Sequence, residues 1–350
     1  MEFEADNGLN IEDVEIDLIE IRVKVEQGDP LQNEASPCKI EYEGETRGSV
    51  PYGKGVMKCS NGETITGHFV NGVAEGHCVS TYLDGSTYEG NYMCGLRSGK
   101  GILLLPGKYS YTGDFLNGLL HGRGLAKKYE TSVTYDGEYK YGMLHGHGTH
   151  VTPRQTYVGQ FRNNLRHGRG TLTCVNGDSY IGDFGDGYYH GHGVFKSVRY
   201  DYDGQFSLGL FHGKGELKYQ NDSIYVGEFK NGLFHGKGEL KRPNGESYVG
   251  EFKNGLYHGK GEVKCPNGES YVGEFKNGLF RGQGVRKYSN GDTVAGTWIN
   301  GRIHGTAFYT FVSGVYGECI SDAHAHAAVA VKTTTFVSAE AAQKRHKSGK

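Results

Sequence analysis

The sequence predicts an all-β protein that is elongated and repetitive, and three observations support this. A motif with an invariant glycine recurs twelve times along the chain, always 22 to 24 residues from the next. Around it, aromatic and glycine residues alternate with charged or branched ones, the period of two that is typical of strands. Asparagine–glycine pairs, as at Asn244 and Asn267, stand where a hairpin would reverse. A fixed period indicates one tandem array rather than two compact domains.

The invariant glycine serves as the anchor from which positions in each repeat are counted. Tyrosine stands at −2, except at Ile65 and Val294, and an aromatic residue stands at +2, except at Thr46. Glycine occupies +9 in every repeat, and +11 in all but two, where Cys78 and Ala307 are also small. The anchors are Gly44, Gly67, Gly90, Gly113, Gly137, Gly159, Gly182, Gly204, Gly227, Gly250, Gly273 and Gly296.

These columns give the pattern Y-x-G-x-F-x-x-G-x-x-H-G-x-G, which resembles the MORN repeat family over residues 42–316. The resemblance implies that each repeat is a β-hairpin. It also implies that the hairpins stack edge to edge into a long, single-layer antiparallel sheet, a twisted or gutter-shaped solenoid. Family members bind partners in the groove of this sheet, self-associate, or have been linked to acidic phospholipids.

Alternation separates two faces of such a sheet. In the repeat anchored at Gly227, Tyr225 and Phe229 share the face of the anchor, whereas Val226 and Glu228 lie opposite. A single sheet has no second layer to cover its aromatic rings, so we expect the rings to lie flat across a neighbouring strand. Only glycine leaves room for them, which explains glycine in strand interiors that otherwise disfavour it.

The ends differ from the array, which we place at residues 42–316. Residues 1–41 form an acidic leader, read as an N-terminal β cap over the open edge of the first hairpin or, alternatively, as a disordered segment. Residues 317–350 are expected to hold a C-terminal cap strand and a basic tail. Residues 1–46 contain 14 acidic and 3 basic side chains, a net charge of −11, so residues 47–350 carry a net charge of +9 in a chain of net charge −2.

The sequence shows no secretion signal and no apolar run of about 20 residues that could span a membrane. Seven scattered cysteines without a C-x-x-C pair indicate a reducing compartment. We therefore expect a cytoplasmic protein. Association with the cytoskeleton or with a membrane stays open. The near-neutral charge and the lack of a basic stripe argue against a nucleic-acid partner.

Histidine is the strongest chemical signal, because eight of the 16 histidines stand at +8. Equivalent positions in stacked hairpins lie about 9.5 Å apart, too far for neighbours to share a zinc ion. We expect turn histidines that pack locally, and we predict no metal and no cofactor. His145, His147 and His150 form the best metal candidate and a weak one. The column is His121, His145, His167, His190, His212, His235, His258 and His304.

Catalysis needs a distinct cluster of groups in a pocket, whereas nearly every charged residue here is one copy of a column. We therefore predict no enzyme but a scaffold or adaptor, whose aromatic and glycine-lined trough binds a protein partner or a second copy of the chain. Two alternatives stay open. One is a peripheral protein on acidic phospholipids, and the other is a mechanical spacer in a cytoskeletal, ciliary or particle assembly.

The predicted interaction surface consists of rings on the aromatic face. Phe234, Tyr257 and Phe280 are expected to be exposed beside the turn, outside the Tyr–Gly–Phe strand column, so that serine replacements would leave the hairpins folded. The strand rings complete the surface, namely Tyr225, Tyr248, Tyr271, Phe229, Phe252, Phe275 and Trp298.

The architecture predicts the shape of the particle in solution. Twelve hairpins supply about 24 strands at 4.7 to 4.9 Å, a rod on the order of 110 Å before twisting shortens it. Small-angle scattering should therefore show an elongated particle. A radius of gyration near 20 Å, about that of a globule of this length, would exclude the predicted array.

Overall fold

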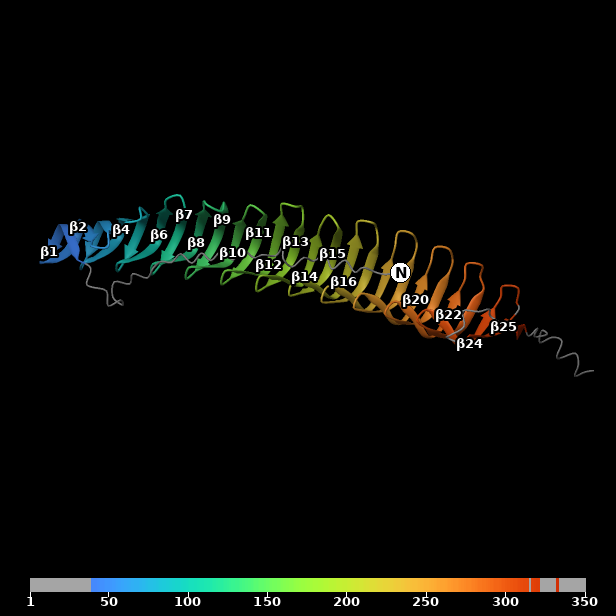
Figure 1. The fold of residues 1–350 in the computed structure, drawn as a ribbon. Helices are drawn as coiled ribbons and strands as arrows, with labels where there is room; N and C mark the ends of the chain where they lie inside the picture. Colours follow the sequence, from blue (N-terminus) through green and yellow to red (C-terminus); the bar gives the residue numbers. More distant parts are fainter. Residues whose placement is uncertain (1–38, 315, 322–331, 334–350) are drawn as a thin grey trace, which may run out of the picture. The chain divides into compact units, whose positions relative to one another are not determined.

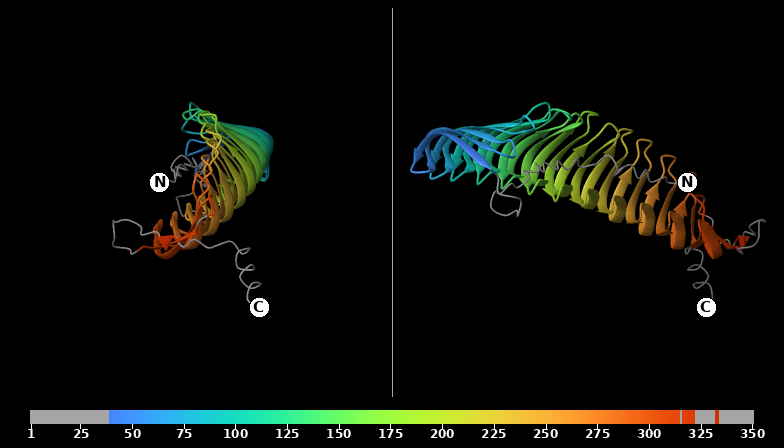
Figure 2. Two further views of the ribbon diagram at one scale, coloured as in Figure 1. Left: turned by 90° about the vertical axis from the view of Figure 1, so that its right-hand side faces the viewer. Right: turned by 60° about the vertical axis from the view of Figure 1, so that its left-hand side comes forward.

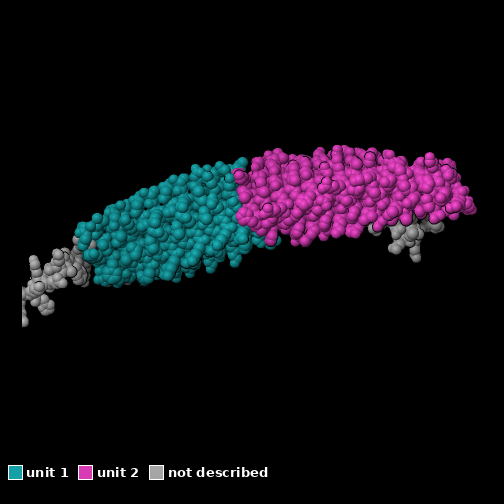
Figure 3. Space-filling model, turned by 180° about the vertical axis from the view of Figure 1, so that it is seen from behind, with its two compact units in different colours: residues 1–10, 198–350 teal, residues 11–197 magenta. Residues whose placement is uncertain are grey.

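The computed structural model describes residues 39–314, 316–321 and 332–333, all of whose regular structure is β. The chain divides into two compact units, which are coloured separately in Figure 3. Unit 2 covers residues 11–197, and unit 1 covers residues 198–350 together with residues 1–10.

Unit 2 contains fourteen described strands. They are β1 (Ile40–Arg47), β2 (Val50–Cys59), β3 (Thr64–Val70), β4 (Val73–Thr81), β5 (Thr87–Met93), β6 (Leu96–Leu105), β7 (Tyr109–Leu116), β8 (Leu119–Lys128), β9 (Val133–Lys140), β10 (Met143–Val151), β11 (Gln155–Arg162), β12 (Leu165–Cys174), β13 (Ser179–Gly185) and β14 (Tyr188–Lys196). Each pairs antiparallel with its neighbours in the chain.

Unit 1 contains twelve described strands with the same antiparallel pairing. They are β15 (Tyr200–Ser207), β16 (Leu210–Tyr219), β17 (Ile224–Lys230), β18 (Leu233–Lys241), β19 (Ser247–Lys253), β20 (Leu256–Lys264), β21 (Ser270–Lys276), β22 (Leu279–Lys287), β23 (Thr293–Ile299), β24 (Arg302–Thr310), β25 (Tyr316–Ser321) and β26 (Lys332–Thr333).

In each unit the strands lie side by side in one layer and rotate gradually along it, with no second layer of described strands (Figures 1 and 2). The predicted all-β class and the open antiparallel sheet of stacked hairpins are thus confirmed. The leader strand predicted as a cap lies outside the described residues. After the last hairpin, β25 pairs with β24, and β26 adds a short pairing to β25.

Each repeat reverses twice, through two different turns. Inside the hairpin, Lys230 faces Leu233 across a two-residue loop, and both loop residues have positive φ, 51° at Asn231 and 80° at Gly232. This is the type I′ turn that suits the twist of paired strands. The chain also reverses at the predicted Asn244, but through a longer loop in which the Asn244 side chain accepts a hydrogen bond from the Glu246 N–H (2.9 Å). Asn–Gly therefore serves two distinct geometries here.

A β-bulge interrupts every hairpin just after the anchor. Gly227 faces Gly238, whereas the next residue, Glu228, faces His235, so two residues of β18 have no opposite partner in this pair. The first of these two, at +9, is a glycine with φ of 56°. Glu228 Oε1 accepts a hydrogen bond from the Lys237 N–H that the bulge frees (3.1 Å). The recurring H-G-x-G segment is therefore the sequence of a bulge.

The core of ten of the twelve repeats is a tyrosine ring lying over two facing glycines. The side chain of Tyr225 is fully buried although the sheet has a single layer. A Cβ added to Gly227 or to Gly238 would come within 2.5 Å of Tyr225 Oη, so neither position tolerates a side chain. The same hydroxyl donates a hydrogen bond to the Glu228 carbonyl (2.8 Å) and lies 3.3 Å from the His235 carbonyl, at the rim of the bulge. The predicted packing of rings over glycine is confirmed.

Two repeats depart from this arrangement, and in each of them both the tyrosine and one of the two glycines are replaced. Ile65 and Val294 replace the tyrosine at −2, and in the same two repeats Cys78 and Ala307 replace the glycine at +11. Cys78 and Ala307 are both buried, in the space that the tyrosine ring fills elsewhere. A side chain at +11 is thus present only where the ring is absent.

Replacing Gly227 by valine should destabilise the protein by roughly 1 to 3 kcal/mol, because the branched side chain overlaps the Tyr225 ring. The matched control is Gly296→Val, where no tyrosine lies and the nearest atom to an added Cβ is Ala307 Cβ at 3.0 Å. Thermal unfolding should show a larger loss and a less cooperative transition for Gly227→Val, since each repeat contacts mainly its neighbours. Equal losses in the two variants would contradict the ring-over-glycine account.

The turn residue Leu208 should be a weak point of the array. It has φ of 51° and is largely exposed, whereas asparagine holds the equivalent turn position at Asn231, Asn254 and Asn277. A left-handed conformation costs a branched residue about 1 kcal/mol more than it costs asparagine or glycine. Leu208→Asn should therefore raise the free energy of unfolding by about that amount in a denaturant titration, and Asn231→Leu should lower it. Stability unchanged in both variants would contradict the assignment of strain.

Candidate functional site

The aromatic face of the sheet, which carries positions −2, +2, +7 and +13, is built in two levels. Tyr225 lies flat on the glycines, between the edges of Phe229 from its own repeat (centroids 5.0 Å apart) and Phe252 from the next (5.1 Å). Phe234, at +7, stacks on the other side of the tyrosine ring at 3.8 Å and 11°. Because the sheet covers one side of Tyr225, Phe234 is the lid that covers the other.

The side chains at +7 are therefore called the lid column, and its composition changes along the chain. In unit 1 four aromatic lids stack on their tyrosines at 3.7 to 3.8 Å. In unit 2 the lids include leucine, alanine and two arginines. The column consists of Pro51, Ala74, Arg97, Leu120, Leu144, Arg166, Tyr189, Phe211, Phe234, Tyr257, Phe280 and Ile303.

The expected exposure of the interaction rings is wrong in part. Tyr257 is only 8% exposed, and Phe234 and Phe280 are half-buried. They are not separate from the strand rings, because each stacks on the tyrosine of its own repeat. The strand rings themselves are core residues, at most 3% exposed, namely Tyr225, Tyr248, Tyr271, Phe229, Phe252, Phe275 and Trp298. Serine at a lid position would uncover a buried ring, so it would not leave the hairpin intact as expected.

Trp298, the single tryptophan of the chain, closes the run of strand rings in unit 1. Its ring packs edge-on against Tyr271 (5.4 Å) and Phe280 (5.5 Å). Its Nε1–H donates a hydrogen bond to the Gly284 carbonyl (3.1 Å). The indole therefore replaces the smaller phenyl ring of other repeats without leaving its polar atom unpaired.

Two arginines take the lid position in unit 2, a role that sequence reasoning missed. Arg97 lies 5.0 Å from the centroid of Tyr88, and its Nη2 donates a hydrogen bond to Tyr82 Oη. Arg166 lies 5.2 Å from the centroid of Tyr157 and is 8% exposed. The spacing of seven residues from the anchor, the same as that of Phe234, was the signal that could have identified both.

Burial raises the pKa of tyrosines throughout the aromatic face, for example to about 12 at Tyr88 and Tyr271. These hydroxyls therefore stay neutral at physiological pH and act as hydrogen-bond donors. Most bond to the bulge carbonyls, but Tyr109 Oη and Tyr139 Oη are buried without a hydrogen-bond partner. The aromatic face of unit 2 is thus more polar, and less completely paired, than that of unit 1.

The histidines at +8 lie beside the bulge on the opposite, outer face. His121 Nδ1 accepts a hydrogen bond from the backbone N–H of Tyr141, in the turn of the next repeat (3.4 Å). The Nδ1 atoms of His145, His167, His212 and His258 are buried without a hydrogen-bond partner. Nowhere in the described ranges do three His, Cys, Asp or Glu side chains gather in a metal-binding group.

Exposed branched residues form a row along the outer face. Val226, Val249 and Val272, at −1, are about half exposed, and Ile181 is more so. Lysines of unit 1 pair with glutamates two residues away on the same strand, as in Lys241–Glu239 (3.0 Å) and Lys264–Glu262 (3.2 Å). The charge of these two lysines is therefore compensated within their own strands.

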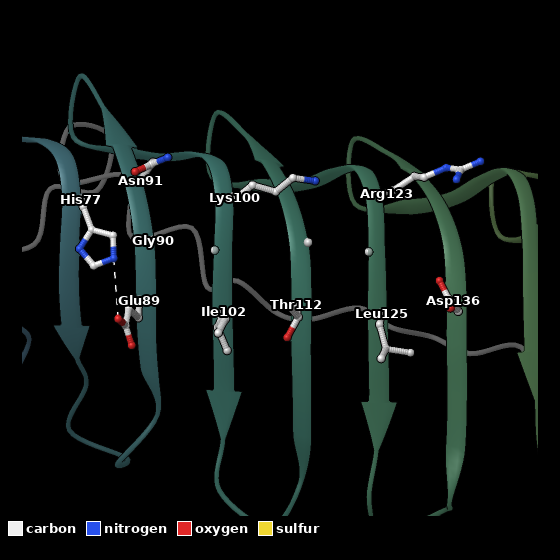
Figure 4. Close-up of a pocket in the computed structure, with 13 residues that line it drawn as sticks. His77, Glu89, Gly90, Asn91, Lys100, Ile102, Thr112, Arg123, Leu125 and Asp136 are labelled. Atoms are coloured by element: carbon white, nitrogen blue, oxygen red, sulfur yellow. Dashed lines mark ion pairs between the residues drawn. The ribbon is translucent and has the colours of Figure 1, made fainter.

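A shallow groove of about 570 Å³ crosses unit 2 on this outer face, from β4 to β9 (Figure 4). Its floor is the backbone of the paired glycines, since they carry no side chains. One rim carries Asn91, Lys100 and Arg123. The other rim carries an apolar, a hydroxyl and an acidic side chain, namely Ile102, Thr112 and Asp136. Lys100 is paired with Asp114 (2.7 Å). The rims do not converge on a point, so the groove offers a recognition surface rather than a cofactor pocket.

Other features of the described residues bear on location and chemistry. No helix in these ranges is long and apolar enough to cross a membrane. Cysteines in both units are free thiols, among them Cys78, Cys94, Cys174 and Cys265.

A tandem array of hairpins with tyrosine over glycine defines a class of β-repeat proteins, and comparison identifies the class. A model of the MORN repeat matches twelve consecutive segments, so the chain belongs to the MORN-repeat family. The matched segments are residues 42–64, 66–87, 88–107, 111–126, 135–154, 157–179, 180–201, 202–224, 225–247, 248–270, 271–293 and 295–316.

Solved structures similar to this chain include two domains in complex with peptide segments. One is the TCP10 domain of CPAP from Danio rerio in complex with a peptide of STIL, with 9% identity, a TM-score of 0.19, and 73% of this chain and 93% of that chain covered. The other is the TCP domain of SAS-4 from Drosophila melanogaster in complex with a proline-rich motif of Ana2, with 11% identity, a TM-score of 0.17, and 65% and 93% covered. A search of curated protein sequences finds no match.

Proposed function

We propose that this chain is a non-enzymatic scaffold that binds a protein partner, or a second copy of itself, along its aromatic face. The observation that carries the proposal is the lid column of unit 1. There, Phe211, Phe234, Tyr257 and Phe280 recur on one face of consecutive repeats, about 9.5 Å apart along the array.

A row of this kind suits an extended partner. Phe234 and Phe280 are half-buried, so each offers part of a ring to a neighbour while the rest holds its tyrosine in place. Aromatic groups on a rigid support are common anchors of interfaces, because they bury much area while losing little conformational freedom. Since the rings stack rather than protrude, a protein surface that packs flat against them is a better match than a lipid layer that must be penetrated.

The proposal is tested by a triple replacement of Phe234, Tyr257 and Phe280 by leucine. Leucine stands at the same position in two repeats of unit 2, at Leu120 and Leu144, so it keeps the lid but removes the ring. We expect at least a tenfold loss of partner capture or self-association, measured by affinity purification from the native source and by analytical ultracentrifugation. Stability should fall by roughly 1 to 2 kcal/mol per site, because leucine is smaller than the ring it replaces and cannot stack on the tyrosine.

The matched control replaces three exposed lysines beside the turns, Lys230, Lys253 and Lys276, by glutamine. It should leave association unchanged. Binding to anionic vesicles that fades with salt, and that is lost only in the lysine variant, would instead support the phospholipid alternative, since each lysine near such a surface contributes about 1 kcal/mol. If neither triple variant alters association, the aromatic face is not the binding surface.

A further inference from the structure

Arg166 is a buried cation without an anionic partner. It extends from β12 on the aromatic face of unit 2, and its side chain is 8% exposed. Its guanidinium lies over the ring of Tyr157, and it makes no ion pair with any carboxylate of the described residues. Arg97, the other arginine of the lid column, differs because it bonds to Tyr82 Oη. Arg166 therefore carries a charge that its own repeat does not neutralise.

The lid function alone does not require this charge. Leu144, in the preceding repeat, and Leu120, one repeat earlier, occupy the same position over Tyr135 and Tyr111, and both are buried. Burial lowers the pKa of the Arg166 guanidinium, which reflects the unfavourable environment of the charge. An uncompensated buried cation destabilises a fold in which an apolar residue of similar size would serve. Arginine at this position therefore lowers the stability of the array. Binding of an anionic ligand would explain why arginine is present there.

The guanidinium is recessed but still accessible. Unit 2 contains side-chain polar atoms that are fully buried and lack a hydrogen-bond partner, such as Tyr109 Oη. No nitrogen of the Arg166 side chain is among them. Its N–H groups therefore still reach solvent at the surface of the aromatic face. A guanidinium presents its donors in a planar fork that matches a carboxylate with two parallel hydrogen bonds. Such a pair is strengthened where the surrounding rings exclude water.

We propose that Arg166 receives a carboxylate side chain of an acidic protein segment that lies along the aromatic face of unit 2. This inference rests on the proposed scaffold function and specifies the chemistry of the partner, which supplies an aspartate or glutamate to Arg166. A protein segment is favoured over a phospholipid because the charge is isolated and recessed on this face, whereas a membrane surface is bound by clusters of exposed basic residues.

The test compares Arg166→Leu with Arg169→Leu in the full chain. Arg169 stands on the same strand, on the outer face, with a side chain that is 90% exposed, so both variants lose one positive charge. The probes are fluorescent dodecapeptides of alternating glutamate and serine, or of alternating glutamine and serine. The wild type should bind the glutamate peptide roughly tenfold more tightly than the glutamine peptide, as a charge-assisted pair predicts. Only Arg166→Leu should abolish that preference.

A second measurement separates loss of binding from loss of folding. Without peptide, Arg166→Leu should melt at a temperature equal to or above that of the wild type, because leucine removes an unpaired buried charge. The glutamate peptide should raise the midpoint of the wild type and of Arg169→Leu but not that of Arg166→Leu. A lower midpoint for Arg166→Leu without peptide would mean that the arginine serves the fold, and would overturn the proposal.

Other outcomes identify a different ligand or a different failure. If both variants lost the preference for the glutamate peptide equally, the preference would come from the net charge of the protein and not from Arg166. That result would overturn the inference. So would displacement of the peptide by inorganic phosphate more readily than by acetate, or binding to phosphatidylserine vesicles that depends on Arg166. If the leucine variants of the unit 1 lids keep their partner while the Arg166 effect holds, the proposed function fails at that surface and the carboxylate site stands.

Discussion

The contact of a tyrosine ring with two facing glycines is the interaction on which the rest of this structure depends. A single-layer sheet cannot bury side chains against a second sheet, so it must bury them against its own backbone. Glycine pairs such as Gly227 and Gly238 provide a flat surface for this purpose, and the ring of Tyr225 covers it. The hydroxyl then reaches the carbonyls at the bulge, where the strand pairing is interrupted. One side chain thus fills the core and stabilises the irregularity beside it.

The lid and the edge-on phenylalanines complete this core from within the layer. Each tyrosine contacts the +2 aromatic residue of its own repeat and that of the next, so burial is shared between consecutive repeats. At Phe234 and Phe280 the lid is more exposed than the strand rings that it covers. Its chemical identity can therefore vary from phenylalanine to arginine without loss of the architecture, and variation at this position changes what the face offers to a ligand.

Most of the fold followed from the sequence, whereas the surface of the candidate site did not. Alternation around Gly227 was enough to assign the two faces, and the recurrence of glycine at +11 was enough to predict rings lying over it. The lids were misplaced because Phe234 follows a turn closely, and its proximity to Asn231 suggested an exposed residue. Its exposure depends on the bulge two residues later, which aligns it with Tyr225 and which no local propensity indicates. The isolation of Arg166 likewise depends on which side chains of neighbouring strands reach it, a matter of three-dimensional packing.

The position of Trp298 has a consequence for how this molecule can be observed. The indole is the only one in the chain, and it lies in the last hairpin of the array, against Tyr271 and Phe280. Its emission on selective excitation therefore reports the local environment of the final repeats, whereas tyrosine absorbance is distributed over the whole array. The two signals are independent optical probes of different stretches of one polypeptide. Their divergence during denaturation would measure directly how far along the chain one repeat senses another.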